Sequence, residues 1–575
     1  MKVFLPVLAL LASCIATNSA QVSAALSIPN LASSEQEKAG RAAEIQAIAN
    51  QIKNEKRTWH IGDREYVFYD GPVVSPGSLA EKIQQSELTT LSTFETTAPA
   101  SLYALALQSP FNTVEDYANF YANATKFMSK PVSIDISDEN FGYQRTTVKG
   151  FSMRTFRDGT DSYPVDTKLT DAAVAQICGG STTLAQLVQA NRLFVTDYSS
   201  YGHWSESIET TGKFVAPVVG FFCYNDDRKK LLPLAIRVVD ANLTYTPFDK
   251  QEEWTLAKMA VDTADINYQQ VQHFADTHAV FVPVRVEVLR NLASSHPVSA
   301  LLLRTNKIDF ALEQRAAVVL FNTSTILDKT FGFGAPGGTT FFGNQLGLLS
   351  LDKDEFTADI EQRGLNHLPV HKYAVYGRLY HDAIASFIDA YLRVYYPSDE
   401  AVQQDAEVQN WAKGLSVVWQ LRGFPSAFAS RAELQKLLTH LLMQTFVRHH
   451  SMNGAPTWET MSVPYSTPGL WKKMPTQKLG ENDTLNILEY STPTRLVPSL
   501  VLFSSNFKRN VPATESLLAL FQNAVFADEP ALAPAIAAFE SALQSIDATI
   551  VSVEQGERWP YLLLRPSMLP HYGWV

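Results

Sequence analysis

Cysteine is scarce in this sequence, which excludes a fold built on a disulfide framework. Only three cysteines occur in 575 residues, and Cys14 lies in an amino-terminal segment that we expect to be removed. Cys178 and Cys223 remain, and they could pair in an oxidising compartment. With 46% hydrophobic residues, the chain has ample material to bury a large core.

Basic clusters and long hydrophobic runs are also missing. The net charge is −11 and no block of Lys or Arg occurs, which argues against binding to nucleic acid or to a strongly anionic membrane. Beyond the amino terminus no apolar run is long enough to cross a bilayer. We therefore expect no transmembrane anchor.

The amino terminus, residues 1–24, is predicted to be a secretory signal peptide. Lys2 precedes an apolar run from Val3 to Ile15, and the small residues up to Ala24 suit cleavage. Secretion agrees with the N-x-[ST] sequons, which are acceptors for glycans. These sequons are at Asn123, Asn242, Asn322 and Asn482. We therefore expect a secreted, extracellular glycoprotein.

Two common enzyme signatures are absent or out of context. No H-E-x-x-H motif occurs, so a zinc protease of that type is unsupported. The GFGAPGG segment at 332–338 matches G-x-G-x-x-G, but no strand leads into it and no helical pattern follows. We therefore predict a loop there rather than a dinucleotide site.

Helical periodicity dominates the second half of the chain, and its longest run extends from Asp249 to Leu292. Further helices are expected at 34–57, 101–130, 299–321, 371–396, 401–415, 430–453 and 514–547. Short antiparallel strands are expected at 191–198, 214–224 and 231–239. A helix as long as 249–292 usually crosses the centre of a large fold.

Two histidines, His273 and His278, lie inside this long helical run. On a regular α-helix five residues turn about 500°, which leaves the two rings roughly 140° apart. They would share a metal only if a π-helical segment lay between about Tyr268 and His278. Taken alone, the spacing is more often that of two separate histidines on different faces.

A second helix, predicted from Ser430, offers another pair of metal-competent side chains. Its apolar stripe continues onto His449 and Asn453, whose i,i+4 spacing places both on one face. Three neutral imidazoles and an amide are poor acid–base catalysts but suit a redox-active first-row metal. The set lacks an anionic ligand, because no Asp or Glu has suitable spacing.

On these residues the sequence resembles the lipoxygenase family. The segments that carry the resemblance are Trp254–Val261, Tyr268–His273, Thr277-His278, Arg290–Leu292, His296-Pro297 and Arg448–Asn453, together with Arg192–Asp197, Leu232–Arg237 and Asp405–Trp411. The resemblance extends from about residue 100 to the carboxyl end. It departs from the common pattern at Tyr268, at Val282 and in the last residues.

The resemblance implies a mainly α fold: one large lipoxygenase catalytic domain at 101–575, with a long central metal-binding helix, small antiparallel β elements and no amino-terminal β-barrel. Residues 25–100 would form an amino-terminal helical or irregular segment. The implied metal ligands are His273, His278, His449, Asn453 and the terminal carboxylate of Val575. Gln269 would hydrogen-bond behind these ligands, while His440 and His450 are expected to be ordinary helix residues.

The resemblance also implies the chemistry. The expected reaction is dioxygenation of polyunsaturated fatty acids of the linoleate or linolenate type, with a non-haem metal(III)–hydroxide removing hydrogen and a hydroperoxide as product. Ala316, Phe331 and Arg509 would position the substrate or oxygen. Secretion and a terminal Val favour one manganese ion, as in secreted fungal enzymes, with iron as the alternative.

The expected protein is a monomer whose partners are a fatty acid and O2. A secreted, catalytically silent lipid-binding protein with the same fold is the competing hypothesis. The intact ligand set argues against it, because a carrier gains nothing from three buried imidazoles.

Overall fold

The structure is a computed structural model, and it describes most of the chain. The described residues are 25–29, 34–52, 54–61, 64–72, 76–93, 98–127, 134–205, 208–315, 320–453, 460–505, 507, 511–527 and 529–573. The predicted signal peptide, Ala316, Arg509 and Val575 therefore lie outside the described residues.

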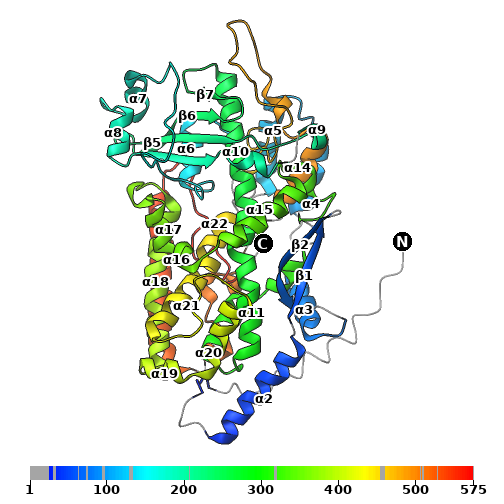
Figure 1. The fold of residues 1–575 in the computed structure, drawn as a ribbon, viewed down its shortest axis with the longest axis vertical. Helices are drawn as coiled ribbons and strands as arrows, with labels where there is room; N and C mark the ends of the chain where they lie inside the picture. The colour runs from blue at the N-terminus through cyan, green and yellow to red at the C-terminus, as the bar shows by residue number, and fades with distance from the viewer. Residues whose placement is uncertain are drawn as a thin grey trace.

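One long helical column runs through the centre of the molecule (Figure 1). It consists of α10 (Gln251–His273), a π-helical turn η4 (Phe274–His278) and α11 (Ala279–Asn291). Nearly every side chain in α10 is buried, and Pro283 lies inside α11. A helix buried on all sides must be covered on all sides, so the rest of the fold packs around this column.

The other α-helices of the described residues make up most of the rest of the fold. They are α2 (Glu35–Gln51), α3 (Leu79–Thr93), α4 (Ala98–Leu107), α5 (Val114–Ala124), α6 (Asp138–Thr146), α7 (Asp171–Cys178), α8 (Leu184–Gln189), α9 (Ile208–Thr211), α12 (Pro297–Thr305), α13 (Asp309–Arg315), α14 (Ile326–Thr330), α15 (Gly334–Leu348), α16 (Leu351–Asp354), α17 (Phe356–Gln362), α18 (Lys372–Tyr395), α19 (Asp399–Gln404), α20 (Ala406–Lys413), α21 (Arg431–Met443), α22 (His449–Asn453), α24 (Val497–Ser505), α25 (Ala524–Ala527) and α26 (Ala533–Glu554). The predicted mainly α class is confirmed.

A small antiparallel sheet lies at one end of the column (Figure 1). Its strands, in spatial and sequence order, are β3 (Arg154–Thr155), β4 (Leu193–Tyr198), β5 (Val218–Asn225), β6 (Lys230–Val238) and β7 (Leu243–Tyr245). Strands β4 to β6 confirm the predicted ones, and they are buried on both faces. A separate hairpin of β1 (Asn54–Ile61) and β2 (Arg64–Pro72) was not predicted. Among the described residues no strands form an amino-terminal barrel.

Cys178 and Cys223 form a disulfide that joins the end of α7 to β5, with their Cα atoms 5.8 Å apart. The pairing left open by the sequence is thus present. Both residues belong to a buried apolar cluster beneath the sheet. The bond therefore fastens one covering helix to the sheet.

Replacing Cys178 and Cys223 together by alanine is expected to lower the free energy of unfolding by about 2–4 kcal/mol, because the bond restricts the unfolded chain. Denaturant titration with and without a reductant measures this. The reductant should weaken the wild-type chain and leave the double variant unchanged. Equal sensitivity of both proteins would contradict the prediction.

The glycine-rich segment 332–338 is largely helical, so the predicted loop is wrong. Helix α15 begins at Gly334, and its glycines serve close packing. A Cβ at Gly337 would lie 1.9 Å from the Trp204 carbonyl oxygen, and one at Gly338 would lie 3.3 Å from Leu327. The glycines that predicted a loop therefore allow α15 to pack closely against neighbouring segments. Helix α14 precedes the segment, so the context of a dinucleotide site is still missing.

Several other predicted helices differ in extent. The helix predicted at 34–57 ends at Gln51, and residues 54–61 form β1. The run 101–130 is divided between α4 and α5, and the run 401–415 between α19, α20 and a π-turn. The run 299–321 is split into α12 and α13 by a break at Asn306. The run 514–547 begins later, since residues 513–519 form short 3₁₀ turns and α26 starts at Ala533. In these places tertiary packing overrides local propensity.

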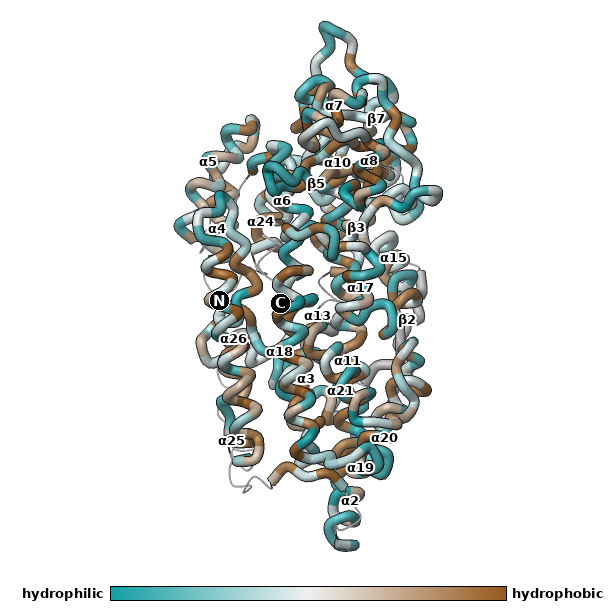
Figure 2. Tube along the Cα trace, turned by 90° about the vertical axis from the view of Figure 1, so that its left-hand side faces the viewer, coloured by the Kyte–Doolittle hydropathy of each residue, from teal (hydrophilic) through white to brown (hydrophobic). Residues whose placement is uncertain are grey.

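Helix α26 corrects the expectation that no later segment could span a membrane. The stretch Pro530–Glu554 is long and apolar enough by length and composition alone, and 22% of its apolar window is buried. It lies at the edge of the helical body (Figure 2). Its buried residues Phe539, Leu543, Ile546 and Ile550 form one stripe, and α26 packs against α18. This pattern is that of an amphipathic surface helix.

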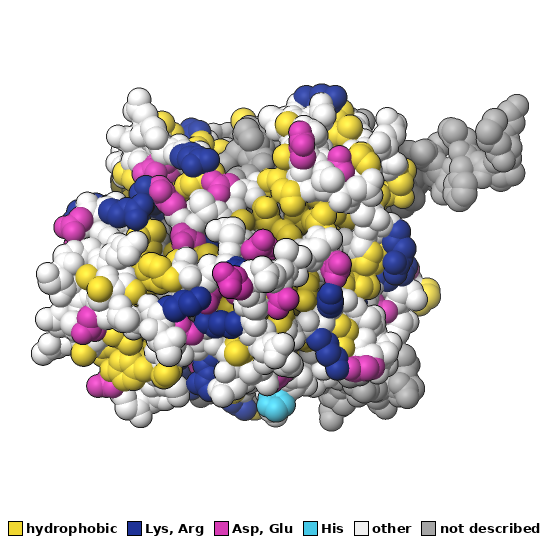
Figure 3. Space-filling model, turned by 90° about the horizontal axis from the view of Figure 1, so that it is seen from above, with side chains coloured by type: hydrophobic (Ala, Val, Ile, Leu, Met, Phe, Trp, Pro, Cys, Tyr) yellow, Lys and Arg dark blue, Asp and Glu magenta, His cyan; other side chains and the backbone are white. Residues whose placement is uncertain are grey.

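The surface charge is mixed. On the face seen from above, Lys and Arg side chains alternate with Asp and Glu, with no large patch of one sign (Figure 3). This agrees with the absence of basic blocks in the sequence.

Candidate metal centre

The predicted π-helical turn is confirmed, and it brings His273 and His278 together. Residues Phe274–His278 form η4, so the chain takes an extra residue per turn between the two histidines. Their ring centroids lie 5.5 Å apart, and both side chains are buried. A regular α-helix would have placed these rings on different faces.

A second π-helical turn, which was not predicted, precedes His449. Helix α21 passes into η8 (Gln444–Arg448) and then into α22. The two π-turns pack against each other. His449 Nε2 lies 3.0 Å from His278 Nε2, and the His449 ring centroid is 6.1 Å from that of His273. Asn453 follows His449 by one turn and is fully buried.

Burial keeps these imidazoles neutral. It lowers the pKa of His273 to about 4, and it lowers the pKa values of His278 and His449 well below the ordinary value, with neighbouring histidines adding to the shift. A neutral imidazole has a free lone pair, which a metal ion requires.

Gln269 contributes to the site in two ways. Its backbone carbonyl oxygen lies 3.3 Å from His273 Nδ1, so a proton on Nδ1 is held there and Nε2 keeps its lone pair. Its side-chain Nε2 donates to the Met452 carbonyl oxygen at 2.8 Å. This bond ties α10 to the residue directly before Asn453.

His450, which was expected to be an ordinary helix residue, contacts the carboxyl-terminal segment. Its Nε2 lies 3.1 Å from the carbonyl oxygen of Tyr572, and Tyr572 is fully buried. One residue later, a Cβ on Gly573 would lie 2.9 Å from the Phe281 ring. Phe281 in turn lies 5.9 Å, between ring centroids, from His278. The carboxyl-terminal segment is therefore packed beside the histidines as far as Gly573.

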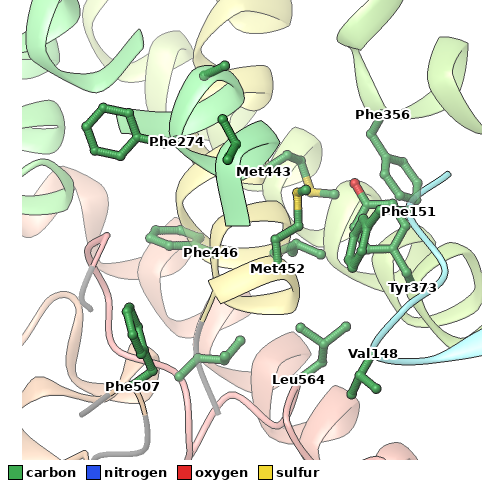
Figure 4. Packing of buried hydrophobic residues seen from close by; sticks show 14 of the residues in the cluster. Val148, Phe151, Phe274, Phe356, Tyr373, Met443, Phe446, Met452, Phe507 and Leu564 are labelled. Atoms are coloured by element: carbon green, nitrogen blue, oxygen red, sulfur yellow. The ribbon is translucent and has the colours of Figure 1, made fainter. Parts of the chain in front are cut away.

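Apolar side chains surround the histidines and exclude water. The Phe274 ring centroid lies 5.2 Å from that of His278. Figure 4 shows Phe274 of η4, Phe446 of η8 and Met452 of α22 among the packed apolar side chains of the core. Such surroundings suit a hydrocarbon substrate better than a polar one.

Comparisons with known proteins identify the family of this chain. A family model described as Lipoxygenase matches residues 142–559.

The chain belongs to the lipoxygenase family.

Among its relatives is the manganese lipoxygenase of Colletotrichum gloeosporioides (strain Cg-14), 29% identical over 409 residues, which are 67% of this chain and 65% of that protein. The manganese lipoxygenase of Nakataea oryzae is 30% identical over 394 residues, which are 64% of this chain and 61% of that protein. The matched region thus spans less than two thirds of these relatives' length.

Solved structures share the fold. The manganese lipoxygenase of Gaeumannomyces graminis matches with a TM-score of 0.82 at 24% identity, covering 95% of this chain and all of that one. A calcium-dependent 11R-lipoxygenase matches with a TM-score of 0.83 at 22% identity, covering 96% of this chain and 83% of that one.

Two of the predicted histidine ligands of this lipoxygenase chain have a spacing that suits a shared metal ion. His278 and His449 face each other through Nε2 atoms at 3.0 Å. Two imidazoles bound at about 2.1 Å to one metal, at a right angle, would lie about 3.0 Å apart. The described side chains contain no group of three or more His, Cys, Asp or Glu residues already spaced for a metal. The His273 ring lies farther away, with its centroid 5.5 Å from that of His278 and 6.1 Å from that of His449.

The remaining predicted residues lie elsewhere or are not described. Phe331 is fully buried and packs against Phe503, with ring centroids 6.2 Å apart. Ala316, Arg509 and Val575 lie outside the described residues. All sequon asparagines are exposed on the surface: Asn123, Asn242, Asn322 and Asn482.

Sequence reasoning missed the ion pair between Asp276 in η4 and Arg448 in η8. Arg448 Nε donates to Asp276 Oδ2 at 2.8 Å, and both residues are buried. The available signal was a charged residue inside each apolar helix close to a histidine: Asp276 two residues before His278, and Arg448 directly before His449.

Proposed function

We propose that this chain is a dioxygenase that inserts O2 into polyunsaturated fatty acids, of the linoleate or linolenate type, to give hydroperoxides. The observation that carries the proposal is the convergence of three neutral imidazoles from two π-helical turns in a dry core. Membership of the lipoxygenase family supports it, as do the apolar side chains around the histidines.

The proposed ligands are His273, His278, His449, Asn453 and the carboxylate of Val575. Burial of the tail through Gly573, beside Phe281, supports the last of these, because two residues span at most about 7 Å. We propose one non-haem manganese ion, with iron as the alternative, since fungal relatives are named manganese lipoxygenases. When bound, the ion supplies the one-electron chemistry that removes hydrogen from the substrate.

The protein's own residues prepare the site for this chemistry. Burial keeps the imidazoles unprotonated, and the Gln269 carbonyl fixes the His273 ring with Nε2 available. Phe274 and Phe281 lie against His278 and exclude water. We further propose that Ala316, Phe331 and Arg509 position the substrate or oxygen. The role of Gln269 would be to hold the two ligand helices together.

We also propose that the protein is secreted as a glycosylated monomer. The exposure of all sequon asparagines supports glycosylation, because a buried asparagine could not receive a glycan.

The test uses the purified full chain, loaded with Mn²⁺ or Fe²⁺ in parallel. We expect bound metal near one equivalent, and O2 consumption with linoleate that is matched by conjugated-diene absorbance. Stearate, which has no bis-allylic carbon, is the control. Bound metal without O2 uptake would instead favour a silent lipid-binding protein.

A further inference from the structure

The two π-turns are joined by a buried polar network centred on Asp276 and Arg448. Asp276 lies two residues before His278, and Arg448 lies directly before His449. Arg448 donates through both Nε and Nη2 to Asp276 Oδ2, with Nε at 2.8 Å. Gln272 Nε2 donates to the other carboxylate oxygen. Both Asp276 oxygens are therefore engaged from defined directions.

A third helix, α17, anchors the same arginine. Arg448 Nη1 lies 3.8 Å from Asp359 Oδ2, and Arg363 Nη2 donates to that oxygen at 2.7 Å. The two arginines and two aspartates carry formal charges that sum to zero. These four groups together thus add no net charge beside a site that would hold a cation. Asp276 and Arg448 are buried, whereas Asp359 and Arg363 are partly exposed.

π-Turns are intrinsically less favourable than α-turns, so each persists only where its surroundings hold it. The planar guanidinium fixes the direction of its bonds as well as their length. A bond between the turns therefore limits how far η4 can rotate or slide against η8. The histidine that follows each charged residue moves with its turn.

We propose that the Asp276–Arg448 pair is a positioning element that holds the two π-turns in register and so sets the separation of the His278 and His449 imidazoles. This inference rests on the proposed histidine metal centre. According to this inference, breaking the pair lowers metal affinity by more than the accompanying loss of folding stability would explain.

The test measures Mn²⁺ binding to the metal-free full-length protein and the electron paramagnetic resonance spectrum of the bound ion. Asp276→Asn keeps the shape of the side chain and removes its charge, whereas Arg448→Lys keeps the charge and removes the planar fork. Each is expected to weaken Mn²⁺ binding by about 10–100-fold and to alter the spectrum. In the double variant Asp276→Asn/Arg448→Lys, the loss should be smaller than the product of the single losses.

The matched control is Asp262→Asn. Asp262 is equally buried on α10 and pairs with Arg145 and Lys149, but it lies away from the histidines near the sheet. This variant should lower the melting temperature of the metal-free protein and leave Mn²⁺ affinity unchanged.

The outcomes separate the two proposals. If the wild-type chain does not bind Mn²⁺ or Fe²⁺, the proposed metal centre fails. If the wild-type chain binds metal and both single variants keep its affinity and spectrum, the positioning role is overturned. Should Asp276→Asn not fold, the same result for Arg448→Lys alone overturns it. A loss of affinity in Asp262→Asn as large as in Asp276→Asn would also overturn it.

Discussion

Replacing His278 or His449 by alanine is expected to abolish metal binding and diene formation together. The Nε2 atoms of these two imidazoles lie 3.0 Å apart. Removing either side chain would therefore leave a bound ion with only one of its two most closely spaced ligands. Metal affinity should fall by at least about 100-fold, since even partners behind the ligands are worth about 10–100-fold. Metal analysis and diene absorbance on the same preparations measure both quantities.

His440→Ala is the matched control for this experiment. His440 is also buried, on α21, which leads through η8 to His449, and burial lowers the pKa of His440 to about 4. Its neighbour is Gln444, at 3.5 Å between side-chain nitrogens. We expect some loss of stability in this variant but normal metal content. A folded His278→Ala or His449→Ala protein with wild-type metal and turnover would remove that histidine from the site.

Gly573→Val is expected to disrupt the approach of the carboxyl-terminal segment to the histidines. A Cβ at this position already lies 2.9 Å from the Phe281 ring, so either the ring or the tail must move. Overpacking of this kind costs about 1–3 kcal/mol. If the Val575 carboxylate binds the metal, affinity should also fall by more than about tenfold, by analogy with other changes around metal sites.

The control for Gly573 is Gly343→Val, at a helical glycine where an added Cβ meets no atom within 4 Å. It should leave metal affinity unchanged. Thermal unfolding and Mn²⁺ titration of both variants separate a packing cost from a loss of binding. A Gly573→Val protein that is less stable but binds Mn²⁺ as tightly as the wild type would show that the tail supplies no ligand.

The sequence alone determined the mainly α class, the central helix and strands β4 to β6, because hydrophobic periodicity depends directly on which face is buried. The need for a π-turn between His273 and His278 also followed from sequence. That deduction was geometric: five residues cannot return to one face of an α-helix, so a shared site demanded an extra residue in the turn.

Predictions from local sequence patterns were wrong where packing against distant segments determines the structure. The glycines of α15 looked like a loop, yet Gly337 is needed because the Trp204 backbone lies against it. The break at Asn306 and the late start of α26 are similar. None of these contacts is encoded in the spacing of nearby residues, so no window along the chain could reveal them.

The arrangement of the site was decided by tertiary structure. Sequence spacing put His449 and Asn453 on one helix face, but only the packing of two helices brings His449 against His278. The second π-turn and the Asp276–Arg448 bond likewise depend on how the two helices pack. Two buried opposite charges stabilise each other only when the fold brings them into contact, and the residues of this pair are far apart in sequence.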